Sequence, residues 1–228
     1  MRFAPEGGPF IIGPLVLAAV ASILSFLVWK AGSGRMVVYP LVFAACLLFV
    51  VTAFMAFFFR DPERAIPEGE GLFVSPADGR IIVIKDVFEP GYLKTETKQI
   101  SIFMSPVNVH VNRAPCDGKV SVVKYSPGKF FAAYKDESSV KNENIVMVLD
   151  GRQGRVLVRQ VAGFLARRAV CRAKVGDELK RGERYGLIKF SSRLDVYLPI
   201  DAEIRVKIGD KVKAGETIIA AVRKDAIP

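Results

Sequence analysis

Two adjacent serines, Ser191 and Ser192, stand between two apolar runs of the segment Gly186–Pro199. A serine hydroxyl becomes a nucleophile when a neighbouring base takes its proton. The sequence contains no G-x-S-x-G elbow, and a Ser-Ser pair by itself is typical of a turn or a strand end. His110 is the only histidine, which excludes zinc and iron sites built from several histidines. Any proton transfer by an imidazole therefore depends on His110.

Three other segments accompany the serine pair. They are Phe58–Arg64, which contains Arg-Asp-Pro-Glu-Arg, Val74–Arg80, which contains Ser-Pro-Ala-Asp-Gly, and Phe103–Pro115, which contains His110. Each is weakly specific alone, but the four in this order resemble the phosphatidylserine decarboxylase family in its short, membrane-tethered bacterial and archaeal form. The resemblance extends from Phe58 to about Ile219.

The resemblance implies a proenzyme that cuts itself between Ser191 and Ser192 and converts Ser192 into a pyruvoyl group. The ketone of that group reacts with the substrate amine and accepts the electron pair released with carbon dioxide, so that phosphatidylserine becomes phosphatidylethanolamine. No metal or external cofactor is expected. The products of the cut, residues 1–191 and 192–228, would remain together as a heterodimer. The family usually has Gly-Ser at the cut, and Ser191 in place of glycine is expected to affect the rate of processing.

By the family's motifs, the acid/base pair falls on Asp78 and His110. In an Asp-His-Ser arrangement His110 would deprotonate Ser192 while Asp78 fixes the imidazole tautomer. The plainer interpretations are that Asp78 is a turn residue before Gly79 and that His110 is a buried strand histidine. Many relatives have a second histidine where this chain has Arg113, so His110 serves both self-cleavage and decarboxylation or another group serves one of them.

Arg167 and Arg168 are candidates for binding the substrate, because guanidinium groups pair well with carboxylates and phosphates. An exposed double arginine on a strand is an equally simple interpretation.

The part of the chain from Gly71 onward predicts a mainly β domain, a barrel or sandwich with at most short helices. Short apolar or alternating runs are separated there by Gly, Pro, Asn and Asp. The expected strands are Arg80–Val87, Gln99–Met104, Val120–Tyr125, Ile145–Leu149, Arg155–Val161, Tyr185–Phe190, Val196–Pro199 and Ile218–Val222.

Two segments of this domain, Lys174–Glu183 and Lys207–Glu216, align without a gap at an offset of 33 residues. They resemble lipoyl-type or biotinyl-type half-domains, with a Gly-Asp turn before each strand. The Met-Lys-Met sequence of biotinyl carriers is absent, so we expect the repeat to be structural.

Residues 1–59 predict a transmembrane helical hairpin, and residues 60–228 the decarboxylase domain. The uncharged stretches 9–29 and 37–59 are each long enough to cross a hydrocarbon core of about 30 Å. Lys30–Met36 between them has turn residues flanked by basic side chains. A cleaved signal peptide is disfavoured because a second span follows directly. We expect the inner cell membrane as the location, with the domain in the cytoplasm, although basic residues flank both ends of the spans almost equally.

The charge distribution favours a membrane surface as the partner. The chain carries a formal charge of +10, of which +2 falls in the first 59 residues and +8 in the rest. Such a domain is attracted to an anionic phospholipid, the expected substrate, although a solvated basic surface is the plainer interpretation. Nucleic acid is not expected, since no recognition motif is visible. The three widely spaced cysteines favour a reducing compartment.

Two alternatives stay open at this point. One is a non-catalytic, membrane-anchored adaptor related to lipoyl-type domains, in which the serine pair is inert. The other keeps the same chemistry but acts on an archaeal-type, ether-linked serine phospholipid. Higher oligomers are not predictable from the sequence.

Overall fold

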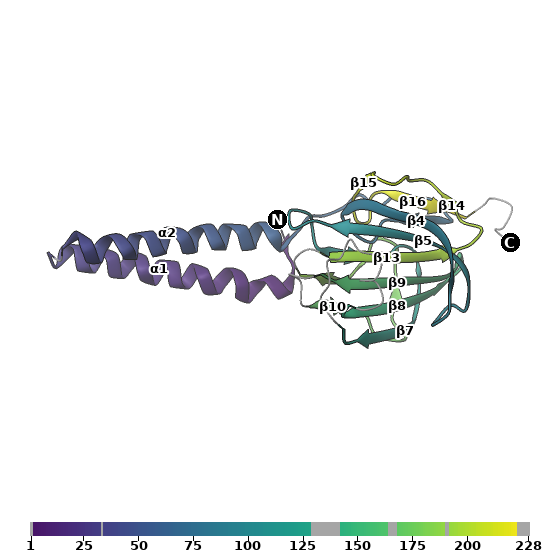
Figure 1. The fold of residues 1–228 in the computed structure, drawn as a ribbon, viewed down its shortest axis with the longest axis horizontal. Helices are drawn as coiled ribbons and strands as arrows, with labels where there is room; N and C mark the ends of the chain where they lie inside the picture. The colour runs from purple at the N-terminus through teal and green to yellow at the C-terminus, as the bar shows by residue number, and fades with distance from the viewer. Residues whose placement is uncertain (1, 33, 129–141, 164–167, 190–191, 223–228) are drawn as a thin grey trace. The chain divides into compact units, whose positions relative to one another are not determined.

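A computed structural model describes residues 2–32, 34–128, 142–163, 168–189 and 192–222 (Figure 1). The chain divides into two compact units, residues 1–62 and 63–228. We describe each unit by itself.

The first unit consists of two long apolar helices, α1 (Gly8–Lys30) and α2 (Arg35–Phe58). A 3-10 turn, η1 (Pro5–Gly7), precedes α1, and the short strands β1 (Arg2–Phe3) and β2 (Arg60–Asp61) pair beside the helix ends. The residues buried in the helices include Ala18, Ser25 and Ala45, whereas most large apolar side chains are exposed. Small residues at a helix contact and apolar residues facing outward are typical of helices in lipid. By length and composition, each helix could cross a membrane.

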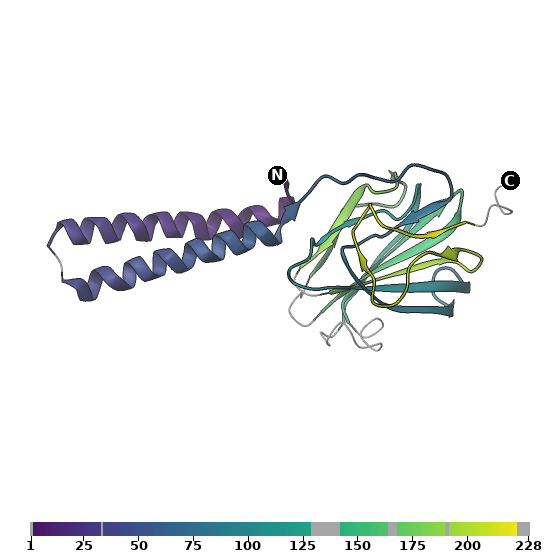
Figure 2. The same cartoon turned by 90° about the horizontal axis from the view of Figure 1, so that it is seen from above.

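The second unit is built around an eight-stranded antiparallel sheet, as counted in the described residues (Figure 1). Its strands, in spatial order, are β11 (Glu178–Leu179), β7 (Gly118–Ser126), β8 (Asn144–Gly151), β9 (Gly154–Ala162), β13 (Ser192–Pro199), β5 (Thr95–Met104), β4 (Gly79–Glu89) and β15 (Lys211–Val212). The sheet curls into a half-barrel, which is visible from above in Figure 2. The expected β-rich domain and the two apolar helices are therefore confirmed.

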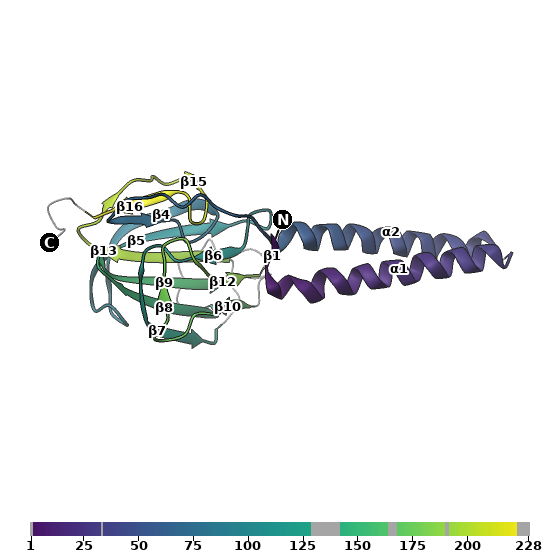
Figure 3. The same ribbon diagram turned by 180° about the vertical axis from the view of Figure 1, so that it is seen from behind.

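In the described part of this unit, two three-stranded sheets accompany the large one. The first contains β10 (Ala169–Cys171), β12 (Arg184–Ile188) and β6 (Val111–Arg113), and the second contains β14 (Glu203–Ile204), β16 (Ile218–Ala221) and β3 (Leu72–Val74). Figure 3 shows β6, β12 and β10 across one face of the large sheet, where β10 and β12 pack on β9.

The main hydrophobic core lies on this face of the large sheet. Along β13 the side chains of Leu194, Val196 and Leu198 enter it, together with Met104 of β5 and Ile188 of β12. Because side chains alternate along a strand, Ser192 points to the same face as Leu194. The hydroxyl of Ser192 is thus placed between the large sheet and the smaller sheet that contains β6.

The two repeated segments adopt the same local structure. The glycine at their third position, Gly176 or Gly209, has φ of +99° or +97°, a conformation that side chains disfavour. Each repeat then supplies a two-residue strand, and these strands, β11 and β15, form the two opposite edges of the large sheet. The repeat therefore has a structural role.

Candidate active site

Ser192 begins the central strand β13. Its backbone is in register with Met104 of β5 on one side and Ala162 of β9 on the other. The residue is completely buried, and its hydroxyl donates to Met104 Sδ at 3.4 Å. A thioether is a weak acceptor and not a base, so this contact orients the hydroxyl without activating it. Ser191, the other residue of the expected cut, lies outside the described residues.

His110 lies just before β6 and is buried. Its Nδ1 is 2.9 Å from the carbonyl oxygen of Asn108. Because a carbonyl only accepts, Nδ1 carries the hydrogen, and in the neutral imidazole the basic lone pair lies on Nε2. The His110 carbonyl accepts from the N–H of Ile188, four residues before Ser192. This pairing connects the histidine segment with the strand that leads to the serine pair.

Asp78 lies in the connection between β3 and β4 and is mostly buried. Its carboxylate accepts the N–H of Ala214 at 2.8 Å and two bonds from Arg64 Nη2 at 2.8 and 3.0 Å. Arg80, two residues later, pairs with Phe103, the neighbour of Met104. Asp78 therefore lies at the same end of the large sheet as Ser192, and its described contacts make it an anchor for Arg64.

Two buried amides that the sequence did not single out lie beside Ser192. Asn112 Nδ2 is 3.8 Å from Met104 Sδ, the atom that Ser192 also contacts, and Gln160 Nε2 donates to Asn112 Oδ1 at 2.9 Å. Asn112 follows His110 by two positions. Because side chains alternate along a strand, this spacing could have indicated that Asn112 lies on the same face as His110. Gln160 is a buried polar residue of β9, and it is in register with Leu194 on the core side of β13. The site thus has neutral hydrogen-bond donors close to the candidate nucleophile.

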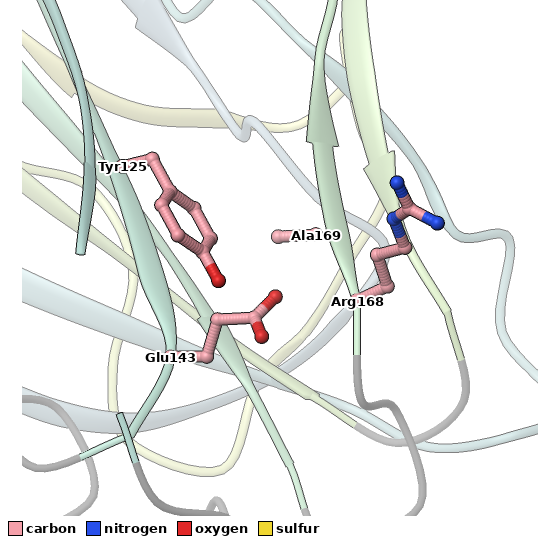
Figure 4. A pocket seen from close by; sticks show the side chains of 4 residues that line it. All are labelled: Tyr125, Glu143, Arg168 and Ala169. Atoms are coloured by element: carbon pink, nitrogen blue, oxygen red, sulfur yellow. The ribbon is translucent and has the colours of Figure 1, made fainter. Parts of the chain in front are cut away.

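A pocket of about 460 Å³ opens at this end of the sheet, lined by Tyr125, Glu143, Arg168 and Ala169 (Figure 4). The Tyr125 hydroxyl lies beside the Glu143 carboxylate (Figure 4). Desolvation raises the pKa of Tyr125, the charge of Glu143 and the hydrogen bond to it raise it further, and Arg168 lowers it. Arg168 is exposed beside β10, while Arg167 lies outside the described residues.

Comparisons with known proteins decide the family. The profile of the family described as Phosphatidylserine decarboxylase matches residues 51–220. The Phosphatidylserine decarboxylase proenzyme of Citrifermentans bemidjiense is 48% identical over 217 residues, which cover 95% of this chain and 94% of the relative. The proenzyme of Symbiobacterium thermophilum is 46% identical over 218 residues, and that of Cupriavidus pinatubonensis is 46% identical over 219 residues. Both alignments cover 95% of this chain and 94% of the relative. The chain belongs to the phosphatidylserine decarboxylase family.

Membership of the phosphatidylserine decarboxylase family confirms the resemblance that the four sequence segments indicated. It also favours an enzyme over the non-catalytic adaptor. The relatives are named proenzymes, which agrees with an enzyme made as a precursor. Among the described residues there is no cluster of three or more metal-ligating side chains.

The residue that follows Ser192 in this decarboxylase belongs to a buried ion pair. Arg193 Nε donates to Asp195 Oδ1 at 2.6 Å, and Arg193 Nη2 donates to Ser101 Oγ at 2.9 Å. The Arg193 and Asp195 side chains are only 1% and 0% exposed. By strand alternation they lie on the face of β13 opposite Ser192. The ion pair thus fixes the beginning of the strand without occupying the space around the serine.

Proposed function

We propose that this chain is a membrane-anchored phosphatidylserine decarboxylase that cuts itself between Ser191 and Ser192 and carries its pyruvoyl group at position 192. The observation that supports this most is the position of Ser192 in a member of this family. It is completely buried at the start of the central strand, on the face that Asn112 and Gln160 share.

The proposed self-cleavage needs only the chain and one water. Ser192 Oγ attacks the carbonyl carbon of Ser191, and the peptide bond between them breaks as an ester forms. A base removes the α-proton of Ser192, and the ester oxygen leaves with Ser191 as its carboxylate. The resulting dehydroalanine takes up water and releases ammonia, which leaves a ketone at residue 192. When present, this pyruvoyl group supplies an electrophile for the substrate amine and an electron sink for decarboxylation.

His110 is the proposed base for these proton transfers. The hydrogen of Nδ1 is directed to the Asn108 carbonyl, so Nε2 is the nitrogen that can accept a proton from Ser192. Asp78 is proposed to stabilise the charged imidazole from the same end of the sheet. Its bonds to Arg64 and Ala214 hold the carboxylate in one position.

The surroundings of Ser192 are compatible with the pyruvoyl group. Conversion removes Oγ and turns Cβ into a methyl group. Met104 Sδ, which accepts from Oγ in the uncut chain, is a soft and polarizable atom that also packs well against a methyl group. Met104 therefore suits both states of residue 192.

We further propose that α1 and α2 anchor the enzyme in the inner cell membrane, with the domain in the cytoplasm, and that Arg167 and Arg168 bind the substrate. The anchor would keep the site close to its lipid, so that the headgroup need not leave the interface. The +8 charge of residues 60–228 supports attraction to an anionic lipid surface.

Intact-mass measurement of the purified protein tests the proposal. We expect wild type to give a fragment of residues 192–228 with a blocked N-terminus and to release carbon dioxide from phosphatidylserine. Ser192→Ala should stay at 25.0 kDa apart from the substitution. Ser126→Ala, at the same end of the sheet on β7, is the matched control and should be cut like wild type. A wild-type chain that stays intact in phosphatidylserine vesicles would refute the proposal.

A further inference from the structure

The pocket at the end of the large sheet has opposite charges on opposite walls. Figure 4 shows the Glu143 carboxylate and the Tyr125 hydroxyl on one side and the Arg168 guanidinium on the other. Glu143 and Arg168, both described residues, form no ion pair with each other. The pocket thus presents a negative and a positive group to whatever enters it.

Glu143 is an unusual residue for such a position, because it is only 8% exposed. Burying a carboxylate is costly unless charged or hydrogen-bonding partners compensate. Figure 4 shows the Tyr125 hydroxyl beside this carboxylate, and one neutral hydroxyl can donate only one hydrogen bond to it. The remaining capacity of the carboxylate to accept hydrogen bonds is directed toward the pocket, where an ammonium group would satisfy it.

The pocket is connected to the candidate reaction centre through neighbouring strands of the sheet. The N–H of Ala162 donates to the Glu143 carbonyl at 2.9 Å, and Ala162 is in turn the partner of Ser192 in the sheet. Two strand spacings of about 4.8 Å therefore separate the backbones of Glu143 and Ser192. On the other wall, the Arg168 carbonyl accepts from the N–H of Lys189, three residues before Ser192.

We propose that this pocket binds the zwitterionic headgroup of an aminophospholipid, with Glu143 receiving the ammonium group and Arg168 the phosphate. The inference rests on the proposed function and adds the site that selects an amine-bearing lipid. Tyr125 is the positioning residue that holds the Glu143 carboxylate. The ammonium contact forms before the amine reacts at residue 192 and again when the ethanolamine product is released.

The reaction itself favours the phosphate as the partner of Arg168. Decarboxylation converts the charged carboxylate into neutral carbon dioxide, so an ion pair with that carboxylate would stabilise the ground state more than the transition state. The phosphate keeps its charge throughout the reaction. A guanidinium on the phosphate therefore positions the headgroup without opposing the loss of carbon dioxide.

Glu143→Gln tests the ammonium contact, because it removes the charge and keeps the shape. In the full-length, self-processed enzyme we expect the KM for phosphatidylserine in mixed micelles to rise about tenfold, with self-cleavage unchanged. Glu178→Gln is the matched control, since it removes an exposed carboxylate from β11, which pairs with the opposite end of β7, and its KM should equal that of wild type. A processed Glu143→Gln enzyme with wild-type KM would overturn the proposal.

Soluble headgroup analogues separate the two walls of the pocket. Phosphoethanolamine carries both charges, whereas glycerol 3-phosphate lacks the amine. As inhibitors of the wild-type enzyme, we expect phosphoethanolamine to bind more tightly. Glu143→Gln should remove that advantage, and Arg168→Gln should weaken both compounds. If the two compounds inhibit wild type equally, the pocket has no site for the ammonium group, either of the lipid or of the free headgroup.

These results remain distinguishable from a failure of the proposed function. If wild type is never cut or releases no carbon dioxide, the decarboxylase assignment fails. If wild type is cut and active while Glu143→Gln behaves as wild type in both assays, only the headgroup pocket fails.

Discussion

Replacing Asp195 by asparagine should destabilise the domain strongly, because it leaves the Arg193 guanidinium buried without its carboxylate. The two side chains are almost completely inaccessible, and their contact of 2.6 Å lies in the central strand. A further bond of this guanidinium, from Nη2 to Ser101 Oγ, is to a neutral hydroxyl. Neither this hydroxyl nor an asparagine amide carries a negative charge, so the variant loses the carboxylate charge that pairs with the buried guanidinium.

The expected loss is about 3–5 kcal/mol, the range found when one partner of a buried ion pair is removed. For a domain of this size, that corresponds to a fall of roughly 6–20 °C in Tm. Removing both charges is different, because apolar side chains of similar volume need no desolvation. The double variant Arg193→Met with Asp195→Leu should therefore recover most of the stability that Asp195→Asn loses.

Thermal melts of the uncut Ser192→Ala protein in detergent, followed by far-ultraviolet circular dichroism, would measure these differences without interference from processing. Fluorescence is unsuitable because the single tryptophan, Trp29, lies in α1. If Asp195→Asn melts within about 2 °C of its parent, or if the double variant is less stable than Asp195→Asn, the ion pair does not have the energetic role that we infer from its burial.

Two further predictions concern Asp78 and Cys116. Asp78→Asn should abolish self-cleavage. Arg64→Gln breaks the same ion pair but keeps the carboxylate and its bond from Ala214, so it should still be cut, more slowly than wild type. Equal cleavage of both variants, followed by gel electrophoresis, would make Asp78 purely structural. Burial raises the pKa of Cys116 to about 12 from 9.0. Its contribution to stability is therefore complete below pH 9 and is lost as the pH rises toward 12. Accordingly, the thiol should resist alkylation at pH 8 in a variant lacking Cys46 and Cys171, and rapid labelling of the folded protein would contradict this.

The sequence predicted the long strands well and the start of β13 poorly. Val196–Pro199 was recognisable as a strand from its apolar residues, but the strand begins four residues earlier, at Ser192. The intervening Arg193 and Asp195 suggest a solvated segment, because charged residues are rarely buried. Their mutual pairing makes burial possible, and a contact between side chains is not visible in a hydrophobic pattern. Short strands such as β6 and β10 were missed because three residues show no periodicity.

The candidate site could be predicted only where one segment carried a recognisable motif. Ser192, His110 and Asp78 stand in such segments, and the fold brings those segments to one end of the large sheet. The Glu143 pocket is different, because its walls come from β7, the start of β8 and the start of β10. Only the antiparallel order of the strands places these residues together, so no motif could have indicated the pocket.

The position of the proposed cut explains how a protein can cut its chain directly before its central strand and keep its fold. The peptide bond between Ser191 and Ser192 precedes the first ladder pair of β13, so the cut removes none of the pairs from Ser192 to Pro199 with β5. Beyond β13, the product of residues 192–228 also supplies β15 at the sheet edge and β16 beside β3. Since β13 is held from both sides, this product can leave only if the large sheet opens. We therefore expect the two products to remain one folded unit, with the new terminus where the serine was.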